Sequence, residues 1–210
     1  MTIPDPVIPG DAPDAYRTIA APAMAEIKIV GSRFLAFASP ATSPEEAHAV
    51  LDALRRTHYD ATHHCSAWRL GTTPDAFRAC DDGEPAGTAG RRILTSIDRR
   101  SLTDLMLVVV RYFGGTKLGV GGLARAYTDA TDAVLDLVTI ETRYVYDAFT
   151  ITFPYDQTSQ VHHVLEGMGA DILDRRWGDA VTYDVRIRTS LSPSLLSHLA
   201  EATDRTVMVD

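Results

Sequence analysis

A cluster of glycines between two strongly patterned segments most constrains the fold of this chain. The apolar, β-branched stretch 102–111 predicts a strand buried on both faces, and the helical spacing of apolar residues after Gly121 predicts a helix. The loop between them contains Gly114, Gly115, Gly119, Gly121 and Gly122. Glycine tolerates positive φ and exposes its N–H groups, so a helix that begins in this loop offers its N-terminus to an anion such as phosphate.

Basic side chains accompany the glycine-rich loop. Residues 81–127 hold seven Lys and Arg against five Asp and Glu, whereas the whole 210-residue chain has a net charge of −8. The candidate anion ligands are Arg111, Lys117, Arg125, Arg91 and Arg92. The loop matches neither a Walker A nor a Rossmann motif, so it indicates neither a nucleotidase nor a dehydrogenase. The alternative is a purely structural loop, in which glycine allows close packing of a helix on a strand.

A short acidic loop precedes a helix predicted over 89–97. Asp81, Asp82 and Glu84 can hold a divalent cation or provide a general base. They can equally cap backbone amides at the start of the helix and favour its positive end. Thr88 is a candidate N-cap for that helix. The sequence leaves the catalytic and the structural interpretation of this loop open.

Histidine and cysteine usage gives weak signals. His63 and Cys65 share one face of a strand predicted over 62–70, as metal ligands or a nucleophile–base pair would. A lone His or Cys on a strand is, however, more often simply packed in the core. Cys65 and Cys80 form no CxxC motif, and two cysteines make no disulfide scaffold. We therefore expect a reducing, cytosolic environment and no cofactor.

The chain divides into three parts by its pattern. Residues 1–25 contain five prolines, which predicts a flexible tail, and they lack the features of a secretory signal. Residues 26–138 contain the motifs described above. A strand–helix–strand–strand–helix–strand order follows over 141–210, which is the ferredoxin-like order. The expected fold class is α+β with two domains, and the longest apolar run, Leu105–Val110, is too short to cross a membrane.

Three strings of residues carry a family resemblance. They are Ala61–Cys65, the DDGEPAGTAG run at 81–90 and the RYFGGTKLGVGGLARAY run at 111–127. Together they resemble the IMPACT family, in particular its bacterial YigZ-like members. For 26–138 the resemblance implies an IMPACT N-terminal domain, with the βαβ fold of a ribosomal small-subunit protein and of domain IV of elongation factor G. For 141–210 it implies a small ferredoxin-like domain, like the last domain of that factor.

Two positions depart from the family pattern, which usually has proline where Arg92 stands and asparagine where His64 stands. The resemblance implies a role in or near the regulation of translation, because eukaryotic relatives regulate translation initiation, and it implies no enzymatic activity.

These observations favour a non-enzymatic cytosolic factor that contacts RNA or the ribosome through the basic, glycine-rich loop. One alternative is a metal-dependent phosphoester or nucleotide enzyme that uses Asp81, Asp82 and Glu84. Another is a protein-interaction module with a protein partner. No membrane partner is expected.

Overall fold

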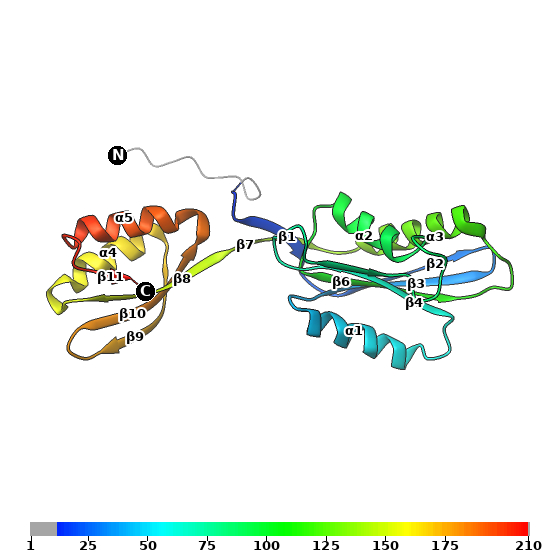
Figure 1. Cartoon of the computed structure of the whole chain (residues 1–210), viewed down its shortest axis with the longest axis horizontal. Helices are drawn as coiled ribbons and strands as arrows, with labels where there is room; N and C mark the ends of the chain where they lie inside the picture. The colour runs from blue at the N-terminus through cyan, green and yellow to red at the C-terminus, as the bar shows by residue number, and fades with distance from the viewer. Residues whose placement is uncertain (1–11, 210) are drawn as a thin grey trace. The chain divides into compact units, whose positions relative to one another are not determined.

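The computed structural model describes residues 12–209, which form two compact units. The N-terminal unit comprises residues 16–142, and the C-terminal unit comprises 143–209 together with 12–15. Both units mix helices with strands, which confirms the predicted α+β class (Figure 1). Among the helices of residues 12–209, none is both long and apolar enough to cross a membrane.

A five-stranded antiparallel sheet forms the centre of the N-terminal unit. Its strands, in spatial order, are β2 (Ala23–Ile29), β3 (Ser32–Pro40), β6 (Leu105–Tyr112), β4 (His63–Arg69) and β5 (Phe77–Cys80). β6 is central and buried from Leu105 to Arg111, which confirms the strand predicted from its β-branched sequence. The sequence predicts only turns over 71–90, but β5 lies there. All four of its residues are exposed, so no alternation of apolar residues marks it.

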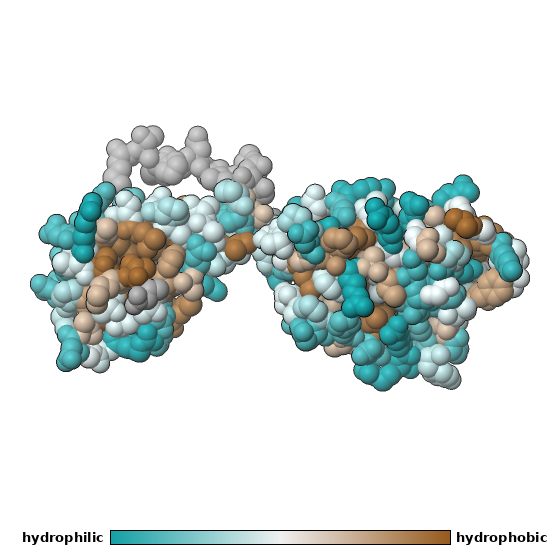
Figure 2. Space-filling view, viewed as in Figure 1, coloured by the Kyte–Doolittle hydropathy of each residue, from teal (hydrophilic) through white to brown (hydrophobic). Residues whose placement is uncertain are grey.

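Helices cover both faces of this sheet (Figure 1). α1 (Pro44–Thr57) packs on one face against β4 and β6, whereas α2 (Gly90–Arg99) and α3 (Gly119–Leu135) pack together on the other. The sequence Ser43-Pro44-Glu45-Glu46 predicts a helix start, with Ser43 as the N-cap and proline in the first helical position. α1 begins there, and the Ser43 hydroxyl accepts a hydrogen bond from Glu46 N at 3.2 Å. The outer surface of α1 is mainly hydrophilic (Figure 2).

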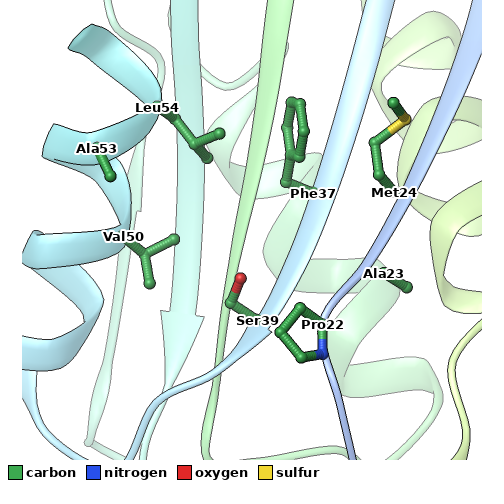
Figure 3. A pocket seen from close by; sticks show the side chains of 8 residues that line it. All are labelled: Pro22, Ala23, Met24, Phe37, Ser39, Val50, Ala53 and Leu54. Atoms are coloured by element: carbon green, nitrogen blue, oxygen red, sulfur yellow. The ribbon is translucent and has the colours of Figure 1, made fainter. Parts of the chain in front are cut away.

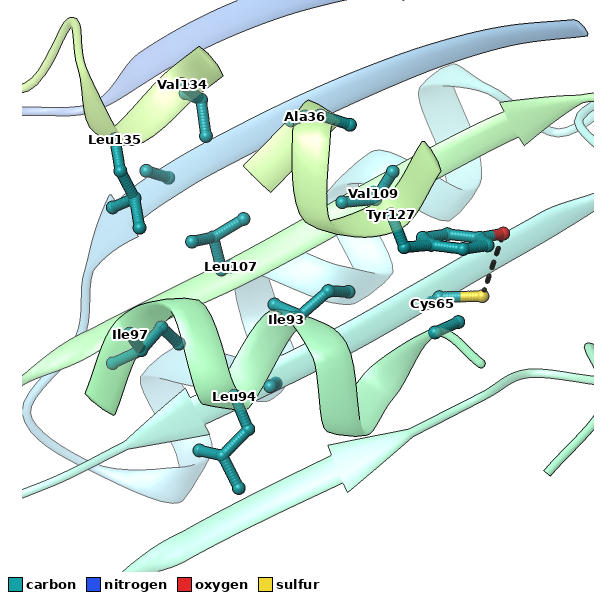
Figure 4. Packing of buried hydrophobic residues seen from close by; sticks show 14 of the residues in the cluster. Ala36, Cys65, Ile93, Leu94, Ile97, Leu107, Val109, Tyr127, Val134 and Leu135 are labelled. Carbon is teal, nitrogen blue, oxygen red and sulfur yellow. Dashed lines mark hydrogen bonds between the residues drawn. The ribbon is translucent and has the colours of Figure 1, made fainter. Parts of the chain in front are cut away.

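The larger core of this unit lies between the sheet and the α2–α3 layer (Figure 4). Tyr127 from α3, Ile93 from α2 and Leu107 from β6 are completely buried there. The next strand residue, Val108, points to the smaller core beneath α1. Because β6 is buried on both faces, its register is fixed, and so is the point at which the glycine-rich loop leaves the sheet.

The C-terminal unit is a four-stranded antiparallel sheet with two helices. Its elements are β8 (Tyr146–Phe153), η1 (Tyr155–Gln157), α4 (Thr158–Met168), β9 (Asp171–Trp177), β10 (Val181–Arg188), η2 (Thr189–Leu191), α5 (Ser192–Ala202) and β11 (Met208–Val209). The spatial order is β11-β8-β10-β9, so the first strand lies between the last and the third. This arrangement confirms the predicted ferredoxin-like order.

Part of the segment predicted to be a flexible tail is regular structure. β1 (Ala15–Ile19) pairs with β7 (Ile140–Tyr144) in a two-stranded sheet, and β2 begins soon after β1. The prediction for 1–25 is therefore wrong from residue 12 onward, because the prolines there stand just before strands, where proline is tolerated. Its remaining part, 1–11, lies outside the described residues. The sequence predicts the boundary between the two domains at about 138–142, and the structure divides the chain at 142/143.

Asp14 lies in the segment predicted to be a flexible tail, but it is buried and forms hydrogen bonds with residues of the C-terminal unit. Its carboxylate accepts hydrogen bonds from Arg188 Nη2 at 2.7 Å, Ser190 Oγ at 2.8 Å and Ser190 N at 3.1 Å. These bonds, that from Arg188 foremost, hold the pKa of Asp14 well below its usual range. The stabilisation is complete above the ordinary aspartate pKa of about 3.9 and is lost progressively as the pH falls below it.

We expect Asp14→Asn to lower the free energy of unfolding of the C-terminal unit by about 2–4 kcal/mol at pH 7, because it leaves Arg188 without its charged partner. The variant should also lose much of the decline in stability between about pH 5 and pH 2. Urea denaturation, followed by Trp177 fluorescence in a Trp68→Phe background, measures both effects. Asp156→Asn, at an exposed site, is the control. Equal stability of Asp14→Asn and the parent protein at pH 7 would contradict this account.

Candidate anion-binding site

Helices α2 and α3 begin at the same end of the N-terminal sheet. β5 and β6 both pair antiparallel with β4, so they run in the same direction, and each is followed by a helix of the same layer. Cys80, at the end of β5, lies opposite Ser66 of β4, and Arg111, one residue before the end of β6, lies opposite His63. The partially positive N-termini of both helices therefore lie at one end of the layer.

The start of α2 is already capped by Asp81. Its carboxylate accepts hydrogen bonds from three backbone amides, among them Gly90 N at 2.8 Å. Burial alone would raise the pKa of Asp81, but these amide bonds hold it below its ordinary value. The prediction that Thr88 is the N-cap is therefore wrong: a tight turn directs its hydroxyl to the Pro85 carbonyl oxygen, to which it donates at 2.6 Å.

The start of α3 has no such partner. Leu118 stands at its N-cap, and no side chain of residues 12–209 accepts a hydrogen bond from the amides of the first turn. A cavity of about 330 Å³ opens beside them, lined in part by Arg111, Phe113 and Lys117. The other lining residues are Glu84, Pro85, Leu118, Gly119, Val120 and Leu123. The cavity thus combines free backbone amides, two cations and an aromatic ring.

Arg111 and Glu84 form a buried ion pair within this lining. Arg111 Nη1 lies 2.6 Å from Glu84 Oε1, and the two side chains are 6% and 3% exposed. Glu84 Oε1 also accepts a hydrogen bond from the Tyr127 hydroxyl at 2.8 Å, and Arg111 Nη2 donates to Ser32 Oγ at 3.3 Å. Arg111 Nε has no hydrogen-bond partner within the part of the chain that the structure describes. Arg111 is therefore a buried side chain held in place by its partners, with its Nε unpaired, rather than a mobile surface cation.

The other basic residues predicted to bind anions lie outside the cavity lining. Arg91 and Arg92 are exposed in the first turn of α2, and neither forms an ion pair within residues 12–209. Arg125 is exposed on α3, where its Nε donates to Gly121 O at 3.3 Å. Arg111 and Lys117 thus both line the cavity, whereas Arg91, Arg92 and Arg125 do not.

The loop glycines serve different purposes. A Cβ at Gly114 would lie 1.9 Å from the carbonyl carbon of Gly31 in the turn between β2 and β3, so packing requires glycine there. A Cβ at Gly121 would meet no atom within 4 Å, so packing does not explain the absence of a side chain in this helical turn. Gly115 and Gly119 have positive φ, and a Cβ at Gly122 would approach Leu118 at 3.1 Å. Close packing therefore accounts for Gly114, whereas the bare backbone at Gly121 suits a closely approaching ligand.

The three carboxylates considered as metal ligands all have protein partners. Asp81 caps α2, Glu84 forms the buried ion pair, and Asp82 accepts hydrogen bonds from His64 N at 2.7 Å and Arg55 Nη2 at 3.0 Å. No group of three or more His, Cys, Asp or Glu within residues 12–209 could hold a metal ion. This geometry favours the structural interpretation of the acidic loop.

His63 and Cys65 belong to the same buried network. His63 Nδ1 lies 2.8 Å from the Asp82 carbonyl oxygen. The Cys65 sulfur lies 3.0 Å from the Asp81 carbonyl oxygen and 3.2 Å from the Tyr127 hydroxyl (Figure 4). Burial raises the pKa of the Cys65 thiol, so the thiol stays protonated near neutral pH. A protonated, hydrogen-bonded thiol in the core is a poor nucleophile.

Phe113 is a candidate functional residue that the sequence motifs do not single out. Its ring is 47% exposed, and the Arg111 guanidinium carbon lies 5.6 Å from the ring centroid. A signal was present in the sequence, because an aromatic residue directly before glycines and Lys117 is typical of surfaces on which bases stack. The alternation of side chains along the preceding strand does not by itself predict that this ring is exposed to solvent.

A separate apolar cavity of about 440 Å³ lies between α1 and the β2–β3 side of the sheet (Figure 3). It is lined by Pro22, Ala23, Met24, Phe37, Ser39, Val50, Ala53 and Leu54. Because this lining contains no charged group, the cavity is unsuited to an oxyanion.

Comparisons with known proteins cover both units. Residues 30–135 match the model of the Impact N-terminal domain, and residues 151–204 match a domain of unknown function, DUF1949. IMPACT family member YvyE of Bacillus subtilis is 30% identical over 190 residues, which cover 90% of this chain and 88% of that protein. IMPACT family member YigZ of Escherichia coli is 35% identical over 148 residues, which cover 70% and 72%.

A solved structure described as that of an hypothetical protein superposes with a TM-score of 0.70 at 29% identity, covering 93% of this chain and 96% of the other. The sequence comparison with YvyE and the structural superposition therefore each cover most of the length of this chain. The chain belongs to the IMPACT family and is similar to its bacterial members YigZ and YvyE.

Proposed function

We propose that this protein binds RNA phosphate at the start of α3 and acts as a non-enzymatic factor in or near the regulation of translation. The observation that carries the proposal is the uncapped first turn of α3, open to a cavity lined by Arg111 and Lys117. Free amides at a helix start, together with cations, bind phosphate oxygen well. Phe113 adds a ring for an unstacked base, which favours single-stranded RNA over a duplex.

The local charge supports an anionic ligand. Glu84 is negative, but its ion pair with Arg111 compensates that charge, so Lys117 and the α3 dipole determine the local potential. The acidic excess of the chain lies elsewhere, since residues 128–210 hold fourteen Asp and Glu against six Lys and Arg. Arg91, Arg92 and Arg125 provide further cations at the same end of the helix layer, which suits a ligand with several phosphates.

The link to translation is carried by the family. The IMPACT family resemblance implies relatives that regulate translation initiation, and it also implies that both domains are similar to domains of elongation factor G. The proposal therefore expects RNA or the ribosome as the partner, in the cytosol. The alternative of a metal-dependent phosphoester enzyme has less support, because its three candidate carboxylates already accept hydrogen bonds from the protein.

Fluorescence anisotropy with a labelled single-stranded oligoribonucleotide, measured over a series of salt concentrations, tests the proposal. We expect affinity to fall steeply with salt, and Lys117→Ala to reduce the slope of log affinity against log salt by about 0.7, because one phosphate contact is lost. Arg56→Ala removes the same charge from the exposed side of α1 and should leave the slope unchanged. The proposal fails if the protein does not bind at low salt, or if Lys117→Ala retains the parent slope.

A further inference from the structure

A second polar cavity lies on the α1-covered face of the N-terminal sheet. It has a volume of about 150 Å³ and is bounded by α1, β4 and β5. His48 and Arg55 are seven residues apart on α1, two helical turns, and so lie on the same side of the helix. Ser66 of β4 and Cys80 of β5 are direct cross-strand partners and share a face of the sheet. The helical and strand periodicities thus bring four polar side chains to one cavity.

Arg78 adds a positive charge that no acidic group neutralises. It is the cross-strand partner of Trp68, so both side chains share the face that lines the cavity. Neither its guanidinium nor the His48 ring has a hydrogen bond or ion pair within residues 12–209. Arg55 donates to Asp82 at 3.0 Å and keeps further N–H donors. Asp82 compensates the charge of Arg55, and no described lining residue is acidic, so Arg78 gives the cavity its excess positive charge.

We propose that this cavity binds a small oxyanion of the phosphate class, held by Arg55 and Arg78 with the Ser66 hydroxyl as a further donor. Guanidinium groups match the geometry of phosphate oxygens. The lining also includes the apolar side chains Leu51, Trp68 and Met106, and Ser66 is only 5% exposed, so water competes weakly for the Ser66 hydroxyl, whereas Arg55 and Arg78 are exposed. The volume of about 150 Å³ leaves room for a phosphate group.

This site is distinct from the proposed RNA site. α1 covers the opposite face of the sheet from α2 and α3, so the two cavities are separated by the sheet itself. Its ligand is either free phosphate or the terminal group of a phosphomonoester, which share the same chemistry. If RNA did not bind at the start of α3, phosphate binding in this cavity would still be expected. If phosphate did not bind in this cavity, the proposed RNA site would be unaffected.

Two signals from the cavity lining measure binding. Trp68 fluorescence in the full-length Trp177→Phe protein is titrated with sodium phosphate, with ionic strength kept constant by sodium chloride. In parallel, neutral iodoacetamide alkylates Cys80, because Cys65 is completely buried. At a phosphate concentration of four times the dissociation constant we expect alkylation to slow about fivefold, as the site is then about 80% occupied. Protection by ribose 5-phosphate as well identifies a phosphomonoester site, whereas protection by phosphate alone identifies a free-anion site.

Arg78→Met keeps the length of the side chain and removes its charge, and it should weaken phosphate binding about tenfold or more. Arg56→Met, on the same helix as Arg55 but outside the lining, is the matched control and should bind as the parent does. Unfolding midpoints of both variants confirm that they remain folded. The inference is overturned if phosphate changes neither signal beyond the effect of sodium chloride, or if Arg78→Met is protected as well as the parent protein.

Discussion

Gly114→Ala is expected to destabilise the N-terminal unit by about 3 kcal/mol or more. A Cβ at this position would lie 1.9 Å from the carbonyl carbon of Gly31 and 2.2 Å from Ser32 N. These are backbone atoms of the turn between β2 and β3, so no side-chain rotation relieves the clash. Gly114 N also donates to Ser32 Oγ at 3.1 Å, and moving the loop would break that bond as well.

Gly121→Ala is the matched substitution in the same glycine-rich loop, and it should raise the stability of the N-terminal unit instead of lowering it. Its new methyl group would meet nothing within 4 Å, and alanine is a better helix former, so we expect a gain of about 0.5 kcal/mol. Urea denaturation of both variants, followed by Trp68 fluorescence in a Trp177→Phe background, measures the difference. Tolerance of Gly114→Ala, or an equal loss in both variants, would show that the loop does not approach the turn as described.

Glu84→Gln should lower the stability of the N-terminal unit by about 3–5 kcal/mol, because it leaves the Arg111 guanidinium buried without a counter-charge. Combining it with Arg111→Met removes that uncompensated charge and should recover a large part of the loss. The same denaturation assay measures all three proteins.

The exposed pair between Arg69 and Asp98 provides the comparison for this effect. Their side chains are 21% and 42% exposed, so Asp98→Asn should cost only about 0.2–1 kcal/mol. If Glu84→Gln proved as mild as Asp98→Asn, or if the double variant were less stable than Glu84→Gln, the buried ion pair would not organise the site as argued here.

Most of the fold follows from local patterns in the sequence. The β-branched run of β6, the cap at Ser43 and the order of elements after residue 143 each depend on neighbours in the chain, and all three predictions are confirmed. β5 and β1 were missed for a different reason. β5 is fully exposed, and β1 depends on pairing with the distant β7, so neither carries a local apolar signature.

The sequence predicts which residues form the candidate site, but it does not predict their contacts with one another. Charge and glycine content identified Arg111 and Lys117, and both line the cavity at α3. The pairing of Arg111 with Glu84 joins residues 27 positions apart, and capping by Asp81 rather than Thr88 depends on a turn that brings a carboxylate back to the helix start. Such choices between equally suitable polar groups are made by tertiary packing, which residue types and spacing do not specify.

The central claim is that the bare first turn of α3 receives phosphate oxygen, and the Gly121→Ala protein tests it most directly. Its fold should be at least as stable as the parent's, so a loss of RNA binding cannot be ascribed to unfolding. In the anisotropy titration at low salt we expect it to bind the labelled single-stranded oligoribonucleotide about tenfold more weakly, because the methyl group displaces phosphate from the amides. Affinity equal to that of the parent protein, with Arg56→Ala also unchanged, would contradict the account.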